Sequence, residues 1–194
     1  MGIDKFTPEN CAILFIDFQT YLVQWIKTTR SAVIRNHVML LLTAAKELRI
    51  PVVFTSCMED SGYGPLLAEF NNIFPSEFGA RINRSGEFNA MNNVDVLKAL
   101  KNTNRKNIVI CGISNDICTA HTAIAAFGCG YNVQVVVDAG GAQTTIANDV
   151  AVRRMEQSGI FVTCTNQLVA ELANNCTSKE CAQLMHMMIS NSKQ

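Results

Sequence analysis

Short apolar runs of strand length, alternating with helical patterns, are the feature that most restricts how this chain can fold. Residues 11–16 read CAILFI and residues 107–111 read NIVIC, with no strict alternation of polar and apolar side chains. Runs of this kind are typical of strands buried on both faces, which occur in parallel sheets covered by helices. Residues 31–48 instead have apolar side chains at three- and four-residue spacing, which indicates a helix. The pattern predicts an α/β protein.

The same interpretation of the whole chain predicts six strands, at residues 11–16, 52–54, 81–83, 107–111, 133–137 and 160–163. Helices are predicted at residues 31–48, 94–100, 117–127 and 144–158, with two more near Gln167 and Lys179. Residues 56–80 are rich in Gly, Pro and Asn and contain at most a short helix around 66–70; connections of such length are often functional. The alternation predicts a three-layer, Rossmann-like α/β fold with a six-stranded, mostly parallel sheet and helices on both faces. Residues 1–194 are expected to form a single domain.

The balance of charges argues against a nucleic-acid partner. The chain has 16 basic and 16 acidic residues and a net charge of +0, which leaves no basic field to hold a phosphate backbone. Only 16% of its residues are charged, against about 25% in ordinary soluble domains. A chain with so few charges is expected to bury part of its surface in a homo-oligomer.

Hydropathy and the arrangement of the cysteines indicate in which cellular compartment the protein is expected. No apolar run approaches the roughly 20 residues of a membrane span, and residues 1–10 are polar, with acidic residues where a signal peptide has basic ones. The eight cysteines include no CxxC pair, so free thiols in a reducing compartment fit better than disulfides. These features predict a cytoplasmic protein with no membrane partner.

Asp17 directly follows the first predicted strand. In open parallel sheets ligands bind beyond the carboxyl ends of the strands, where the strand order reverses, and the residues after Cys111 are expected at the same edge. A dinucleotide site would need a glycine-rich turn after the first strand, but residues 17–20 read DFQT. The sequence therefore argues against a nicotinamide or flavin cofactor, and no other cofactor is expected.

Cys118 is the candidate nucleophile. It lies at or near the first turn of the helix that follows the fourth strand, in the sequence GISNDICTA. The amides and dipole of a helix start favour negative charge, so a thiol there is expected to have a lowered pKa. The alternative is that Cys118 is one more buried small residue, as free cysteines commonly are. No other cysteine of this chain combines the carboxyl end of a strand with a helix start.

Three further side chains are candidate partners of this thiol. Asp17 ends the strand expected to neighbour the fourth strand, so its carboxylate could act as general acid and base, or could only cap a turn. Arg84 follows the weak third strand, where an arginine is usually a solvated surface residue. His121, one helical turn beyond Cys118, raises the alternative of a Cys-His dyad.

Taken in order, these residues make the sequence resemble the isochorismatase-like cysteine hydrolases. The resemblance runs from residue 11 to residue 163, and its most specific part is GISNDICTAHTA, residues 112–123. It implies a catalytic triad that maps onto Asp17, Arg84 and Cys118. Most of that family has lysine where this chain has Arg84, and the local sequence RSGEFNA is similar to the YcaC-like subgroup. Because arginine stays protonated it cannot shuttle a proton, and the base role falls on Asp17.

The resemblance also implies details of the site. The bond between Ile113 and Ser114 matches the place where relatives hold a cis peptide, and the amides of Ser114 and Cys118 would form an oxyanion hole. Relatives that bind a metal use an Asp and histidines after the first two strands. This chain has at those places Gln19, Cys57 and Glu59, so no metal is expected. Candidates for the substrate pocket, with ordinary packing as the alternative, are Gln19, Trp25, Phe88, Asn89, Asn115 and His121.

The activity that the resemblance implies is cleavage of a C–N bond in a small amide, imide or ureide through a thioester on Cys118. Retention of Cys118 argues against vinyl-ether hydrolysis of the isochorismatase type. Two alternatives stay open: a catalytically impaired oligomeric binding protein, and a redox-sensing thiol protein. The apolar C-terminal helix, about residues 178–190, is expected at an oligomer interface. Together with the low charge it predicts a tetramer or a larger assembly, and the resemblance points toward an octamer.

Overall fold

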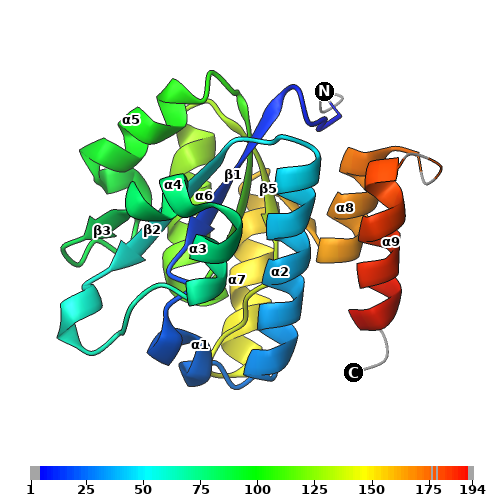
Figure 1. Ribbon diagram of the computed structural model, residues 1–194. Helices are drawn as coiled ribbons and strands as arrows, with labels where there is room; N and C mark the ends of the chain where they lie inside the picture. Colours follow the sequence, from blue (N-terminus) through cyan, green and yellow to red (C-terminus); the bar gives the residue numbers. More distant parts are fainter. Residues whose placement is uncertain (1–4, 176, 178, 192–194) are drawn as a thin grey trace.

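A computed structural model describes residues 5–175, 177 and 179–191, and Figure 1 shows a central sheet with helices packed on both sides. The strands in this part of the chain are β1 (Cys11–Ile16), β2 (Val52–Cys57), β3 (Ile82–Arg84), β4 (Asn107–Gly112), β5 (Asn132–Val136) and β6 (Phe161–Thr163). They form one six-stranded sheet in the order β3-β2-β1-β4-β5-β6. Every neighbouring pair is parallel, which confirms the predicted α/β fold.

Two hydrophobic clusters lie on opposite faces of this sheet. One is covered by α2 (Ser31–Glu47), α3 (Ala68–Ile73), α8 (Thr165–Ala173) and α9 (Lys179–Asn191). The other is covered by α5 (Val94–Asn102), α6 (Ala120–Gly128) and α7 (Thr145–Gln157). The remaining short helices described are α1 (Thr20–Trp25), η1 (Glu59–Ser61), α4 (Pro75–Gly79), η2 (Ala90–Asn92) and η3 (Asn115–Thr119). The molecule is therefore a helix, sheet, helix sandwich.

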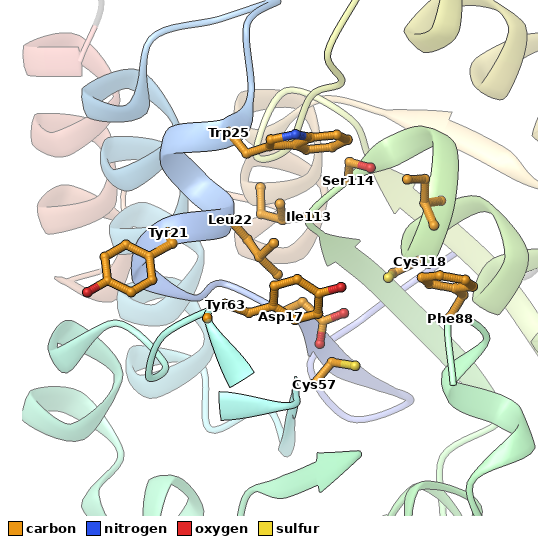
Figure 2. A pocket seen from close by; sticks show the side chains of 12 residues that line it. Asp17, Tyr21, Leu22, Trp25, Cys57, Tyr63, Phe88, Ile113, Ser114 and Cys118 are labelled. Atoms are coloured by element: carbon orange, nitrogen blue, oxygen red, sulfur yellow. The ribbon is translucent and has the colours of Figure 1, made fainter. Parts of the chain in front are cut away.

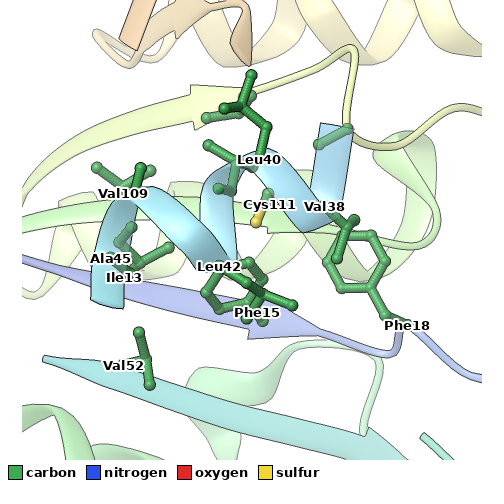
Figure 3. Packing of buried hydrophobic residues seen from close by; sticks show 14 of the residues in the cluster. Ile13, Phe15, Phe18, Val38, Leu40, Leu42, Ala45, Val52, Val109 and Cys111 are labelled. Atoms are coloured by element: carbon green, nitrogen blue, oxygen red, sulfur yellow. The ribbon is translucent and has the colours of Figure 1, made fainter. Parts of the chain in front are cut away.

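The apolar side chains of β1 pack into the hydrophobic clusters on both faces of the sheet. Ile13 and Phe15 belong to the cluster under α2, and Figure 3 shows them beside Leu42 and Ala45 of that helix. Leu14, between them, belongs to the cluster under α5 and α6. Because successive side chains of a strand point to opposite faces, a strand covered on both sides must be apolar at every position, as β1 is.

The strand order reverses at β1, and the candidate site lies at this point of the sheet. From β1 the chain passes to β2 and β3 on one side, then returns to β4, which pairs with β1 on the other side. The connections therefore diverge at the carboxyl ends of β1 and β4, where a crevice forms in sheets of this type. Asp17 follows β1 and Ser114 follows β4.

Several predicted boundaries were wrong around the long connection after β2. β2 continues to Cys57, and residues 58–80 contain η1, α3 and α4 where at most one short helix was expected. β3 covers Ile82–Arg84, so Arg84 ends the strand instead of following it. Helix α1 was not predicted. Helices of five or six residues are marginal by themselves and form here because tertiary packing supports them.

The C-terminal helix packs largely within its own chain. α9 contacts α2 and α8, and Leu184 is fully buried in the cluster that α2 covers. Met187 and Met188 pack against the same cluster. α2 and α8 therefore contact this helix within the chain, and its expected place at an oligomer interface stays a prediction. Residue 178, in the range expected for this helix, lies outside the described residues.

Within the described ranges, no helix combines the length and hydropathy that crossing a membrane requires.

Candidate active site

Asp17 lies at the floor of the site, directly after β1. The chain turns there with a φ of 57°, a left-handed conformation that aspartate tolerates better than most residues. Its backbone N–H donates to the Thr55 carbonyl oxygen at 2.9 Å, and its own carbonyl accepts from the Gln19 amide at 2.7 Å. The carboxylate is fully buried. A buried charge requires a partner, and Arg84 supplies it.

Arg84 is fully buried at the end of β3. Its partner across the sheet is Cys57, the last residue of β2. All three nitrogens of its guanidinium donate hydrogen bonds: Nε to Thr55 Oγ1 at 2.8 Å, Nη1 to the Glu87 carbonyl, and Nη2 to both carboxylate oxygens of Asp17, with Oδ1 at 2.5 Å. The burial of Arg84 rules out the alternative of a solvated surface arginine. The position has instead become the cationic half of a buried ion pair.

Cys118 lies opposite this pair, in the π-helical turn η3 that leads into α6. The residue is 8% exposed, and its side chain interacts with the Asp17 carboxylate and the Arg84 guanidinium. Figure 2 shows the sulfur directed toward the side of the cavity where Asp17 lies. The structure thus brings together Asp17, Arg84 and Cys118, three residues that lie far apart in the sequence.

The pKa values of this cluster depart from the expectation at the thiol. Burial raises the pKa of Cys118 well above its ordinary value, and the Asp17 carboxylate raises it further, while Arg84 lowers it. The expectation of a lowered pKa from the helix start is therefore wrong for the unliganded site. Burial also raises the pKa of Asp17, against the opposing effect of Arg84. A carboxylate with a raised pKa is a stronger base, so Asp17 is the group beside the thiol that could accept its proton.

The turn between β4 and η3 carries the amides that face this cluster. The peptide bond between Ile113 and Ser114 is cis, at the position where the resemblance placed one. The Ile113 amide donates to the Ile16 carbonyl at 3.0 Å, and the Asn115 amide donates to the Gly141 carbonyl at 2.8 Å. Between them, the Ser114 amide has no acceptor within the described part of the chain. It is available to hydrogen-bond to a ligand.

A cavity of about 420 Å³ lies over these groups. Its lining combines the catalytic candidates with aromatic and aliphatic side chains, and consists of Asp17, Tyr21, Leu22, Trp25, Cys57, Gly62, Tyr63, Phe88, Ile113, Ser114, Ile117 and Cys118. In the view of Figure 2, Asp17, Cys57 and Cys118 lie toward one end and Trp25 toward the other. The volume suits a small molecule, since ligand pockets measure roughly 300–1,000 Å³.

Four of the side chains expected in the pocket have structural roles instead. Gln19 is fully buried and holds the connection after β2 in place, since it donates to the Cys57 and Gly64 carbonyls and accepts from the Cys57 amide. Asn89 caps η2 by accepting from the Met91 amide. Asn115 donates to the Val137 carbonyl and to Asn148.

His121 is the fourth of these. It is exposed, and its Nδ1 lies 2.8 Å from the Ile117 carbonyl, so the geometry gives no support to a Cys-His dyad. Trp25 and Phe88 do line the cavity, as expected.

Sequence reasoning missed several residues that shape the site. Thr55 accepts a hydrogen bond from the Arg84 guanidinium, and its one signal in the sequence is that it is a polar residue directly after the apolar run Val52–Phe54. Tyr21, Leu22 and Tyr63 line the cavity, but they belong to α1 and to the long connection before α3, whose shapes the sequence did not reveal.

Glu59 stands at one of the positions where some relatives have metal ligands, but its carboxylate binds Arg81 and Ser56. Its carboxylate accepts from Arg81 Nε at 2.7 Å and Nη2 at 2.8 Å, and from the Ser56 hydroxyl at 2.6 Å. These bonds lower the pKa of Glu59. Among the residues that the structure describes, no three His, Cys, Asp or Glu side chains cluster as a metal site would require.

Comparison with known proteins gives matches over most of this chain. The isochorismatase domain model matches residues 11–167. A probable hydrolase of Escherichia coli, YcaC, is 33% identical over 155 residues, which cover 80% of this chain and 74% of that protein. Its crystal structure, described as an octameric hydrolase of unknown specificity, superposes with a TM-score of 0.93 at 28% identity, covering 100% of this chain and 95% of that one. YcaC of Pseudomonas aeruginosa, solved with hexane-2,5-diol and covalent acrylamide, also gives 0.93, at 26% identity, covering 100% and 96%.

Proposed function

Because this chain belongs to the isochorismatase family and is a hydrolase similar to YcaC, we propose that it cleaves the C–N bond of a small amide, imide or ureide through a thioester on Cys118. The observation that carries the proposal is the buried cluster in which Cys118 and Asp17 line one cavity and interact electrostatically, while Asp17 pairs with Arg84. A nucleophile, a base within hydrogen-bonding reach and a charge that orients the base are the parts that covalent catalysis needs.

In the first half-reaction Asp17 takes the thiol proton and the Cys118 sulfur attacks the substrate carbonyl. The carbonyl π electrons move to the oxygen, which the amides of Ser114 and Cys118 would stabilise as an oxyanion. When the tetrahedral intermediate collapses, the C–N bond breaks and Asp17 returns its proton to the leaving nitrogen. Arg84 keeps its proton throughout, because a guanidinium does not lose it at any working pH.

In the second half-reaction Asp17 takes a proton from water, and the resulting hydroxide attacks the thioester carbonyl. Collapse breaks the C–S bond, and the proton held by Asp17 returns to the Cys118 sulfur. The products are a carboxylic acid and the regenerated thiol. The raised pKa of Asp17 supports this double role, because the same carboxyl must accept and release a proton in each half.

A related protein supports a reactive nucleophile in this group. YcaC of Pseudomonas aeruginosa has been solved with covalent acrylamide, a small amide that is also an electrophile. An electrophile becomes covalently bound only where a nucleophile attacks it, and the thiolate is the reactive form of a cysteine.

The test is the acyl intermediate itself. The protein is mixed with a panel of small amides, quenched in acid and analysed by intact mass, and we expect a mass increase equal to the acyl group of a substrate. Cys118→Ala should abolish both the adduct and turnover, whereas Cys129→Ser, at an exposed cysteine outside the cavity, should behave like the parent. Turnover that survives Cys118→Ala would refute the thioester mechanism.

We further propose that residues 1–194 form one hydrolase domain that assembles as a homo-oligomer. The octameric state of the Escherichia coli relative and the low fraction of charged residues, 16%, support the assembly. Exposed apolar side chains of α7, Ile146 and Val150, offer a surface for it, since exposed apolar patches commonly mark contacts between proteins.

A further inference from the structure

The walls of the active-site cavity are apolar apart from its catalytic end. Most of the lining comes from aromatic and aliphatic side chains, including Leu22, Trp25, Tyr63, Phe88 and Ile117. Trp25 and Phe88 are 40% and 59% exposed, so much of their apolar surface stays free of contact with the protein core. Apolar walls with a few convergent polar groups are the usual form of a small-molecule site.

In the part of the chain that the structure describes, no Lys or Arg side chain lines this cavity. Among the described residues that line it, Asp17 is the only Asp, Glu, Lys or Arg. Arg84 lies behind it, 1% exposed, and each of its three nitrogens already has an acceptor, in Thr55, Glu87 or Asp17. A substrate carboxylate would lose its hydration without gaining a partner, and it would lie near the Asp17 charge.

Ser114 adds a polar group that an uncharged amide can satisfy. Its side chain lines the cavity, is 3% exposed, and has no hydrogen-bond partner for Oγ in the described part of the chain. A buried hydroxyl without a partner is unfavourable until something supplies one. An amide offers both an N–H donor and a carbonyl acceptor, so it can pair with this hydroxyl without bringing a charge into the cavity.

We propose that the site selects uncharged amides with an apolar acyl group and rejects amides that carry a carboxylate. This inference rests on the proposed amide hydrolysis and narrows its substrate class. The cavity of about 420 Å³ lies near the lower end of the roughly 300–1,000 Å³ found for ligand pockets, which suits acyl groups between butyryl and benzoyl in size.

Matched pairs of amides test the proposal on the parent protein: butyramide against succinamate, and benzamide against 4-carbamoylbenzoate. Ammonia release and acylation by intact mass are measured near neutral pH, where both acids are ionised. We expect kcat/KM for the uncharged member of each pair to be higher by at least about 100-fold. Equal values would overturn the inference and leave the hydrolase intact, whereas no acylation by any of the four would overturn the proposed amide hydrolysis and the inference with it.

A charge placed on the cavity wall provides the second test. Leu22→Arg should raise the succinamate-to-butyramide ratio of kcat/KM by about tenfold or more, because the new cation can pair with the carboxylate. Gln24→Arg is the matched control, since it adds the same charge to an exposed position of the same helix that does not line the cavity. An equal change in both variants would overturn the role of the cavity wall. If Leu22→Arg does not fold, as circular dichroism would show, the parent ratios decide.

Discussion

At the scale of single residues, Asp17 affects the Cys118 thiol in two opposing ways. As a neighbouring anion it raises the pKa of the thiol, which keeps the resting cysteine protonated. As a base with a raised pKa of its own, it is the group to which the thiol proton can pass. The nucleophile would therefore be formed when substrate is bound, in contrast to a sensor cysteine that is ionised at rest.

Asp17→Asn separates these two effects. Removal of the anion should lower the pKa of Cys118, because Asp17 raises it and Arg84, which remains, lowers it. Iodoacetamide should then label Cys118 faster at neutral pH than in the parent, while turnover falls by roughly 10²–10⁴-fold for want of the general base. Labelling rates by peptide mass spectrometry, measured from pH 6 to about pH 10, check the sign. Slower labelling in Asp17→Asn would contradict the assigned electrostatics.

The exposed Cys129 is the internal control for that experiment. In the parent near neutral pH, we expect Cys129 to react faster than Cys118, because burial raises the pKa of Cys118 and leaves it 8% exposed. Asp17→Asn should leave the rate at Cys129 unchanged, so a change at both cysteines would indicate a general loosening of the fold.

Arg84 also explains why a lysine is not equivalent at this position. The guanidinium donates to Thr55, Glu87 and Asp17 from three different nitrogens. The single nitrogen of a lysine cannot reproduce that fork. Hydrogen bonds to Thr55 and Glu87 hold the guanidinium in place while it binds the Asp17 carboxylate. This geometry suits the proposed role of Arg84, which is to orient the base without exchanging a proton.

At the scale of elements, the turn between β4 and η3 depends on the loop after β5. Gly140 packs so closely that a Cβ there would lie 2.4 Å from the Gly112 carbonyl oxygen and 2.5 Å from Asn115 Oδ1. The Asn115 amide in turn donates to Gly141. The two loops therefore hold each other, and through them the position of Ser114.

Gly140→Ala should disturb this contact. We expect the free energy of unfolding to fall by about 1–3 kcal/mol, the usual cost of overpacking, and turnover to fall as the backbone beside Ser114 shifts. Gly128→Ala is the control, because a Cβ at that helical glycine would meet no atom within 4 Å. Chemical denaturation and amide turnover measure the two effects. Normal stability and activity in Gly140→Ala would show that the loops are not coupled as the close approach indicates.

At the scale of the whole molecule, α7 carries some of the apolar side chains that packing within the chain leaves exposed. Ile146 and Val150 are 73% and 55% exposed, and their spacing of four residues puts them on one face of the helix. By contrast, α9 contacts α2 and α8. Removal of residues 179–194 would therefore expose core residues of the same chain, and it would be a poor test of assembly.

Val150→Glu is the sharper test of the proposed oligomer. Light scattering of the parent at micromolar concentration should give several times the 21.3 kDa of one chain, and the added charge should lower that mass, because a desolvated anion is costly in an interface. Gln157→Glu adds the same charge at an exposed position of the same helix and should leave the mass unchanged. A parent mass of one chain would refute the oligomer, and a Val150→Glu oligomer of unchanged mass would place the interface elsewhere.

Local patterns in the sequence were enough to predict the fold and the edge of the sheet at which the site lies. Runs such as residues 11–16 and 107–111 predict buried parallel strands because side-chain periodicity is a local property. The residues that follow such strands, Asp17 and those leading to Cys118, are then brought to the same carboxyl edge by the topology.

Only the tertiary structure decided what surrounds those residues. Arg84 is buried against Asp17 and Thr55. Gln19 and His121 form hydrogen bonds outside the cavity. The apolar walls of the cavity come from α1 and the long connection after β2. The tertiary structure also reversed the expected pKa shift of Cys118. The physical reason is that burial, desolvation and ion pairing depend on which groups meet in space, and segments far apart in the chain meet only when the sheet forms.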